Sequence, residues 1–258
     1  MALTNKTIAS TYGDILQADN SGSGRTANGT TIKDGLGQST ALTLGQNKLH
    51  VKPSTDQTDA VVIETSGGTD LLVVDTSNSA VKLGTSQTYA NTQIQKFAVQ
   101  QTGAVAGTHY PMFTDTTLGG GGTSVLTAMG TGTDPSDSYT ISSGTLILTT
   151  CYWYIPAAIT IDEVRVIAGG EAVDAINFHL KSFTMATGTG SDAGDLSSGT
   201  LLAHNGSTLT IGADRITTTT LTVDSGSVAA DKVVFAFIEN VGATTDLTAQ
   251  LIVKYHYQ

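Results

Sequence analysis

The sequence predicts an all-β protein, in which a short helix and a stalk of short strands precede a jelly-roll-like β-sandwich. Three observations support this fold class. Apolar and β-branched residues recur at a period near two in many short segments. Turn-forming residues, including 29 glycines, separate these segments. Only 13% of the residues are charged, whereas disordered chains are typically rich in charge and poor in apolar residues.

The stretch from Thr149 to Phe183 has the clearest strand pattern. It contains the single Trp and the single Cys of the chain, followed by apolar residues in alternation. Large aromatic and β-branched side chains at this period are typical of a half-buried sheet. The residues that we expect to face inward are Ile159, Ile161, Val164, Val166, Ile176, Phe178 and Leu180.

Residues 5–19 hold the one segment with a helical pattern. Four apolar side chains at spacings of four, three and one mark a single face, namely Ile8, Tyr12, Ile15 and Leu16. Thr4 or Asn5 can cap the start of this helix. A short helix is marginal alone and must bury its apolar face. Two interpretations stay open, because this face could pack within the chain or anchor it to a partner or a larger assembly.

Residues 41–83 form short predicted strands with two or three apolar positions each. So few apolar side chains bury too little area to offset the conformational entropy of the ordered chain. We therefore expect three copies to share one core, as closed symmetric oligomers do. The predicted seam of this homotrimer consists of Leu42, Leu44, Val61, Ile63, Leu72 and Val74. A single-chain sandwich with a small core is the alternative.

The pattern divides the chain into three parts. We predict an anchor helix and trimeric β-stalk over residues 1–95, a loop-rich linker over 96–140 and a sandwich head over 141–258. The strands expected in the head are Thr145–Thr149, Trp153–Ile155, Ile159–Ala168, Ala175–Phe183, Gly199–Leu202, Thr208–Ile211, Thr217–Val223, Lys232–Glu239 and Leu247–Tyr257. Val233–Ile238 is apolar throughout and should be a central strand, whereas Thr217–Thr220 should lie at an edge.

Charge and cysteine content exclude several kinds of partner. The net charge of −10 and the scattered basic residues argue against nucleic acid and anionic membranes. No segment has an apolar run long enough to span a bilayer. One Cys excludes an internal disulfide framework and any Cys-based zinc site.

The sequence shows no convincing catalytic or metal site. The five histidines stand in separate segments without the spacing of metal ligands; they are His50, His109, His179, His204 and His256. Two acidic loops, Asp134–Asp137 and Asp192–Asp195, lack the spacing of a calcium cage and are expected to be turns. The adjacent Asp162 and Glu163 should point to opposite faces of a strand. We expect no enzyme activity and no cofactor.

Two groups of segments resemble known viral proteins. KTIASTYGDILQADNS, IKDGLGQSTALTL, LHVKP and LLVVDTSNSAVKLGT resemble the leaders and shaft modules of bacteriophage virion appendage proteins. WYIPAAITIDEVRV, AINFHLKSF, FAFIENVG and LIVKYHYQ are similar to β-sandwich heads of phage structural proteins. The resemblance implies a homotrimer on the virion, in contact with the major capsid protein or the tail. It implies assembly or adhesion and transfers no catalytic residue.

These observations rank the candidate functions. Decoration or cementing of the outer face of a capsid comes first, because an acidic protein is disfavoured against packaged DNA and the chain is short for a receptor-reaching fibre. A tail or head fibre that binds a host receptor is the alternative. A carbohydrate-binding module is a different class, for which the available aromatics are Tyr152, Trp153, Tyr154, Tyr255 and Tyr257. Such a cluster in strands more often belongs to a core.

Overall fold

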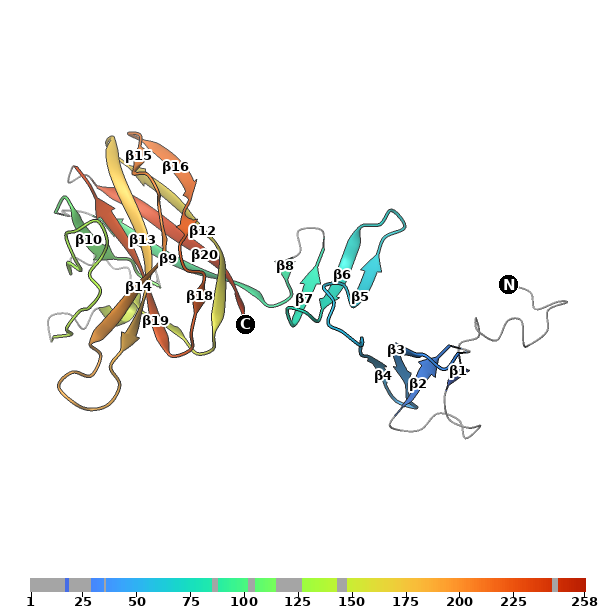
Figure 1. Cartoon of the computed structure of the whole chain (residues 1–258). Helices are drawn as coiled ribbons and strands as arrows, with labels where there is room; N and C mark the ends of the chain where they lie inside the picture. Colours follow the sequence, from blue (N-terminus) through green and yellow to red (C-terminus); the bar gives the residue numbers. More distant parts are fainter. Residues whose placement is uncertain are drawn as a thin grey trace. The chain divides into compact units, whose positions relative to one another are not determined.

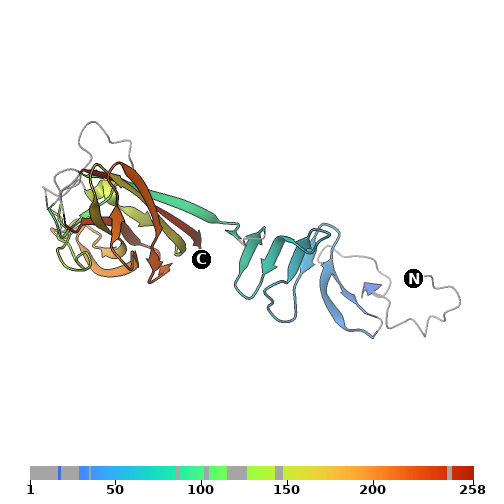
Figure 2. The same ribbon diagram turned by 90° about the horizontal axis from the view of Figure 1, so that it is seen from above.

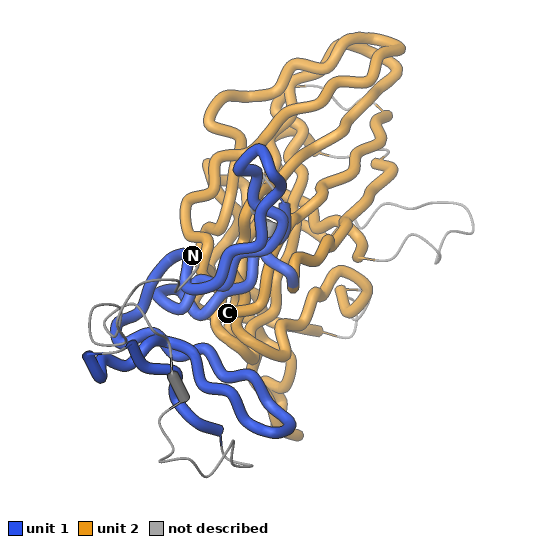
Figure 3. The backbone as a smooth tube through the Cα atoms, turned by 90° about the vertical axis from the view of Figure 1, so that its right-hand side faces the viewer, with its two compact units in different colours: residues 1–90 blue, residues 91–258 orange. Residues whose placement is uncertain are grey.

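The computed structural model of the chain describes residues 17–18, 29–34, 36–84, 88–101, 105–114, 127–142, 148–242 and 246–258. Within these residues the protein contains strands joined by turns and loops and no α-helix. All strand pairs inside the sheets are antiparallel. The predicted all-β class is therefore confirmed. The chain separates into two compact units, residues 1–90 (unit 1) and residues 91–258 (unit 2), coloured blue and orange in Figure 3.

Unit 1 contains two four-stranded meanders, labelled in Figure 1. The first consists of β1 (Gln17–Ala18), β2 (Thr30–Lys33), β3 (Ser39–Leu44) and β4 (Leu49–Val51). The second consists of β5 (Val61–Glu64), β6 (Asp70–Asp75), β7 (Ala80–Leu83) and β8 (Thr88–Tyr89). In both sheets the strands follow one another in sequence order. Val73 is the one hydrophobic side chain in the described part of unit 1 that is buried.

The end of the predicted N-terminal helix is wrong. Gln17 and Ala18 form strand β1, whose partners are Lys33 and Ile32 of β2. The backbone of these two residues pairs with a strand further along the chain, and a local helical pattern cannot reveal such a partner. The predicted anchor residues Ile8, Tyr12, Ile15 and Leu16 lie outside the described residues.

Unit 2 is a β-sandwich of two sheets, visible as two layers in Figure 1 and Figure 2. The five-stranded sheet has the order β16-β12-β20-β9, with β18 paired to β12. Its strands are β9 (Thr92–Gln101), β12 (Ile159–Gly170), β16 (Arg215–Thr220), β18 (Ser227–Val228) and β20 (Leu247–Tyr257).

The seven-stranded sheet has the order β10-β19-β13-β14-β17, with β11 paired to β19 and β15 paired to β13. Its strands are β10 (Thr108–Pro111), β11 (Trp153–Ile155), β13 (Asp174–Met185), β14 (Leu196–His204), β15 (Leu209–Ile211), β17 (Thr222–Val223) and β19 (Lys232–Asn240). The central place of β19 and the edge place of β16 are confirmed.

One core lies between the two sheets. Alternate residues of β20 enter it from one layer, whereas alternate residues of β13 and β19 enter it from the other. The predicted inward-facing residues Ile159, Ile161, Val164, Val166, Ile176, Phe178 and Leu180 all belong to this core. The alternation in the sequence therefore indicated both layers correctly.

A second, smaller core covers the other face of the seven-stranded sheet. Phe183, Phe235 and Phe237 project from this face and are fully buried. Met129 and the partly buried Tyr139 and Ile141 pack against them from the segment 127–142, which we call the strap. The strap was predicted to be mostly linker, and it is instead a cover for an aromatic sheet face.

The observed boundaries differ from the predicted division. β9 and β10 lie in the segment assigned to the end of the stalk and to the linker, yet β9 pairs with β20 and β10 pairs with β19. The alternation of Phe97, Val99 and Gln101, all buried, explains why β9 belongs to unit 2. Residues 148–151 form a 3₁₀ turn where a strand over 145–149 was expected, and residues 143–147 lie outside the described residues.

Candidate functional site

One face of the sheet β5–β7 is apolar. Val74 of β6 lies opposite Val61 of β5 and Val81 of β7. Leu72 lies opposite Ile63 and Leu83 in the same way. Directly opposed residues of antiparallel strands project from the same face. Six side chains therefore form one apolar face, consisting of Val61, Ile63, Leu72, Val74, Val81 and Leu83.

Nothing in the described part of this chain buries that face. Ile63 is 54% exposed, Leu83 is 49% exposed and Val81 is 41% exposed. The other three residues are half-buried. A contiguous exposed apolar patch is typical of an interaction surface.

The sheet β2–β4 repeats this arrangement on a smaller scale. Leu42 lies opposite Val51, and Leu44 lies opposite Leu49. All four side chains are on one face, where Leu49 is 65% exposed and Val51 is 37% exposed. Both sheets of unit 1 thus have one apolar face that the described residues leave open.

The structure places the predicted seam residues in two sets. Leu42 and Leu44 share the face of one sheet, and Val61, Ile63, Leu72 and Val74 share the face of the other. Sequence reasoning left Leu49, Val51, Val81 and Leu83 out of the seam. These residues share a face with the predicted ones because the turns between the strands fix the register. The tight turn after Asp75 was the signal in the sequence from which the pairing of β6 with β7 could have been inferred. Their role in a trimer stays a prediction.

The opposite face of β6 and β7 carries a polar turn. Asp75 is fully buried, and it accepts hydrogen bonds from Lys82 Nζ at 2.8 Å, Asn78 Nδ2 at 2.8 Å and the Asn78 backbone N–H at 3.0 Å. The Lys82 ammonium, followed by Asn78, lowers the pKa of Asp75 to about 2. This turn holds β6 and β7 in the register that creates the apolar face.

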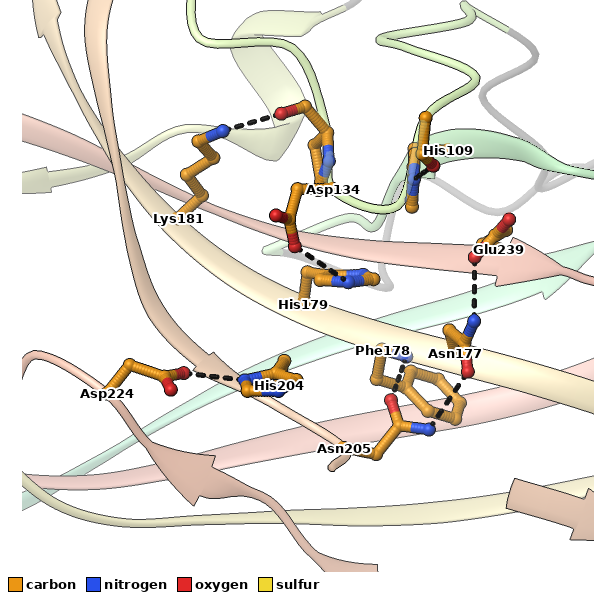
Figure 4. A network of polar contacts seen from close by, with 12 residues as sticks. His109, Asp134, Asn177, Phe178, His179, Lys181, His204, Asn205, Asp224 and Glu239 are labelled. Atoms are coloured by element: carbon orange, nitrogen blue, oxygen red, sulfur yellow. Dashed lines mark hydrogen bonds and ion pairs between the residues drawn. The ribbon is translucent and has the colours of Figure 1, made fainter. Parts of the chain in front are cut away.

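A polar network with a buried centre at His109, His179 and Lys181 contacts the strap in unit 2 (Figure 4). Asn177, His179 and Lys181 project from the outer face of β13, next to His109 of β10, Glu239 of β19 and His204 of β14. The rings of His109 and His179 meet edge to face with centroids 4.8 Å apart, and those of His179 and His204 stack at 6.4 Å. His109 and His179 are both buried.

Asn177, His179 and Lys181 of β13 each have at least one polar partner. Lys181 Nζ donates to the Pro135 carbonyl and to Asp137 Oδ1, each at 2.5 Å. Asn177 Nδ2 donates to Glu239 Oε2 at 2.9 Å, and His204 Nδ1 lies 2.7 Å from Asp224 Oδ2. His179 Nε2 lies 3.5 Å from Asp134 Oδ1. The network therefore attaches the strap to β13.

These contacts explain the acidic loop Asp134–Asp137. The Lys181 ammonium binds both the Pro135 carbonyl oxygen and the Asp137 carboxylate, and it therefore takes the place that a metal cation would need in this loop. In the other acidic loop, Asp195 Oδ1 accepts a hydrogen bond from the Ile141 N–H, which fixes the end of the strap. No cluster of three His, Cys, Asp or Glu residues that could hold a metal exists within the described ranges.

The histidine network was not predicted from the sequence. His109, His179 and His204 belong to three strands that are distant in sequence, and only the order β10-β19-β13-β14 brings them together. A signal was present in β13. Because Ile176, Phe178 and Leu180 face the core, the alternate residues Asn177, His179 and Lys181 must share the other face.

The aromatic residues considered for carbohydrate binding belong mostly to the core. Trp153 packs between Phe97 and Tyr255, at ring centroid distances of 6.2 Å and 4.9 Å. Tyr152 packs edge to face on Phe235 at 4.7 Å. Tyr154 and Tyr257 are the more exposed of these aromatic side chains, at 48% and 37%.

Cys151 is fully buried in the second core, and burial raises the pKa of its thiol to about 12.

Comparison with known proteins does not assign this chain to a family. No protein family matches the sequence, and no curated protein matches it. A chain in the structure of infectious bursal disease virus Gx strain is similar at 7% sequence identity with a TM-score of 0.24, over 65% of this chain and 34% of that chain. The present chain thus spans about a third of that protein's length. The described residues include no helix with the length and apolar character to cross a membrane.

Proposed function

We propose that this protein is a non-enzymatic structural protein of a phage particle that assembles as a homotrimer through unit 1. The observation that carries the proposal is the contrast between the two units. Unit 2 has two cores of its own, whereas Val73 is the one buried hydrophobic side chain in the described part of unit 1. A unit without a core is stable only when other chains complete it.

The covering surface is best supplied by further copies of the same chain. The apolar faces of the two sheets must be covered when unit 1 folds, so the partner has to be present at synthesis and in equal amount. Identical copies satisfy this condition, and closed symmetry lets each apolar face pack against its equivalents. Fully burying one Val, Leu or Ile contributes about 1.5–3 kcal/mol. The two apolar faces together contain ten such side chains per copy, and each is half-buried or exposed in the single chain. Burying them between copies is a sufficient source of stability.

The place on the particle rests on charge and on the resemblance of the sequence segments. A chain with net charge −10 is repelled by packaged DNA, which favours the outer face of the shell. The segments resembling phage shaft modules fall in unit 1, and those resembling phage sandwich heads fall in unit 2. We therefore propose a capsid decoration or cement protein, with a tail or head fibre as the second candidate.

Two measurements test this function. Light scattering on the purified full chain should give three times the monomer mass of 26.5 kDa, and a folded monomer at micromolar concentration would overturn the trimer. Quantitative mass spectrometry of purified particles should give a copy number comparable to the major shell protein. A few multiples of three would indicate a fibre, and absence from particles would refute the virion role.

A further inference from the structure

We propose that the strap over residues 127–142 is an acid-released cover above the paired rings of His109 and His179, closed while His179 is neutral and opened when His179 takes up a proton. The inference concerns unit 2 alone and is independent of the proposed trimer. It rests on which atoms of these two rings have partners and which do not.

The Nε2 atom of each ring faces the strap. His109 Nε2 lies 2.8 Å from the Gly132 carbonyl oxygen, so this nitrogen carries the proton and donates it. Backbone bonds reinforce the contact, since the His109 N–H donates to Gly130 O and the Met129 N–H donates to His109 O, both at 2.9 Å. His179 Nε2 faces Asp134 at 3.5 Å.

The Nδ1 atoms of His109 and His179 are buried and have no hydrogen-bond partner within the described part of the chain. In a neutral ring that donates through Nε2, Nδ1 is a bare acceptor, and leaving it unpaired costs little more than its own desolvation. Protonation would place an N–H group and a positive charge at the same buried position. A buried donor without an acceptor, and above all a buried charge, is strongly unfavourable.

The surrounding charges on balance oppose protonation. The rings of His109 and His204 and the Lys181 ammonium on β13 disfavour a cation on His179, whereas a hydrogen bond to the backbone of Thr133 on the strap favours one. Asp134 of the strap, which is half exposed, lies 3.5 Å from His179 Nε2. Asp137 is engaged by Lys181, Asp224 by His204, and Glu239 by Asn177. Burial, followed by the electrostatic effects of His109, His204 and Lys181, lowers the pKa of His179 from 6.5 to about 3.

Linkage gives the direction and size of the response. With the strap open, His179 is solvated and titrates near 6.5, whereas with the strap closed it titrates near 3. Between these values the open form binds more protons, so the population of the open form rises as the pH falls. Each pH unit below 6.5 adds about a factor of ten, which gives about 100-fold more opening at pH 4.5 than at neutral pH. Opening exposes the aromatic face formed by Phe183, Phe235 and Phe237.

Hydrogen exchange of the full-length protein at pH 7.0 and pH 4.5 tests the proposal. After correction for intrinsic exchange rates, protection of strap peptides should fall by up to about 100-fold, whereas that of β20 peptides should change little. His179→Gln should remove the pH dependence. His256→Gln is the matched control, because His256 is a buried histidine of the other sheet, paired with Asp162 at 2.9 Å.

Equal strap protection at both pH values would overturn the proposal, as would a pH dependence that persists in His179→Gln. If that variant does not fold, the ring titration of His179 in the wild-type protein decides by NMR. A midpoint below pH 4 is expected, and a midpoint near 6.5 would refute the switch.

Discussion

Val74 of β6 lies directly opposite Val81 of β7, so both side chains leave the sheet on the same face. Neighbouring residues in the same strands leave on the other face, where Val73 opposes Lys82. Because side chains alternate in this way, two adjacent substitutions test two different surfaces of unit 1. The alternation supplies the control for the first prediction.

Ile63→Asp should abolish the homotrimer, whereas Val62→Asp should leave it intact. The two residues are neighbours in β5 on opposite faces, and both are already exposed in the single chain, at 54% and 37%. A carboxylate buried in a shared apolar core costs several kcal/mol, and about 3 kcal/mol per site weakens association by more than 100-fold. Light scattering over a concentration series measures the mass of each variant and thus its association. Equal masses for the two variants would show that the apolar face is not the seam.

Lys82→Met should raise the pKa of Asp75 from about 2 toward its ordinary value of 3.8. In the wild-type chain this carboxylate stabilises the folded state above pH 3.8, and the contribution is lost as the pH falls through 2. The titration of the Asp75 carboxyl carbon, followed by NMR, gives both midpoints. Lys52→Met, outside this turn, should leave the midpoint near 2. A wild-type midpoint near 3.8 would contradict the assigned hydrogen bonds.

Much of unit 2 could be predicted because its strands alternate. β20 places Leu247, Ala249, Leu251 and Val253 in the core, as its period of two indicates. The continuous apolar run of β19 correctly indicated a central strand. The structure covers this strand on both faces, with Ala236 in one core and Phe237 in the other.

Pairing between distant segments could not be predicted in the same way. β9 belongs to unit 2 because it pairs with β20 at the far end of the chain, and no local pattern specifies that partner. The same limit applies to the strap. Its attachment depends on Lys181 and His179, whose neighbours are set by the sheet order rather than by spacing in the sequence.

Gly199→Ala should destabilise unit 2 by about 1–3 kcal/mol, the usual cost of an overpacked contact. A methyl group there would lie 2.7 Å from Lys181 Cε and 2.8 Å from Asp137 Cα, where the Gly199 N–H also donates to Asp137 O at 2.9 Å. The strap backbone would have to move. Gly206→Ala is the control, since its methyl group would meet Thr222 Oγ1 at an ordinary 3.7 Å. Denaturant unfolding followed by Trp153 fluorescence compares the two. Equal free energies of unfolding would mean that the strap does not press on β14.

Cys151 should resist alkylation in the native protein. Its side chain is fully buried beside the aromatic residues of the second core, and burial raises its pKa from 9.0 to about 12. Because the thiolate is the reactive form, a shift of this size lowers the reactive fraction at pH 8 by about 1000-fold, before any effect of access. Intact mass after treatment with iodoacetamide should show no added group on the native chain and one on the chain in urea. Rapid labelling of the native protein would show that the second core opens on the time scale of the reaction.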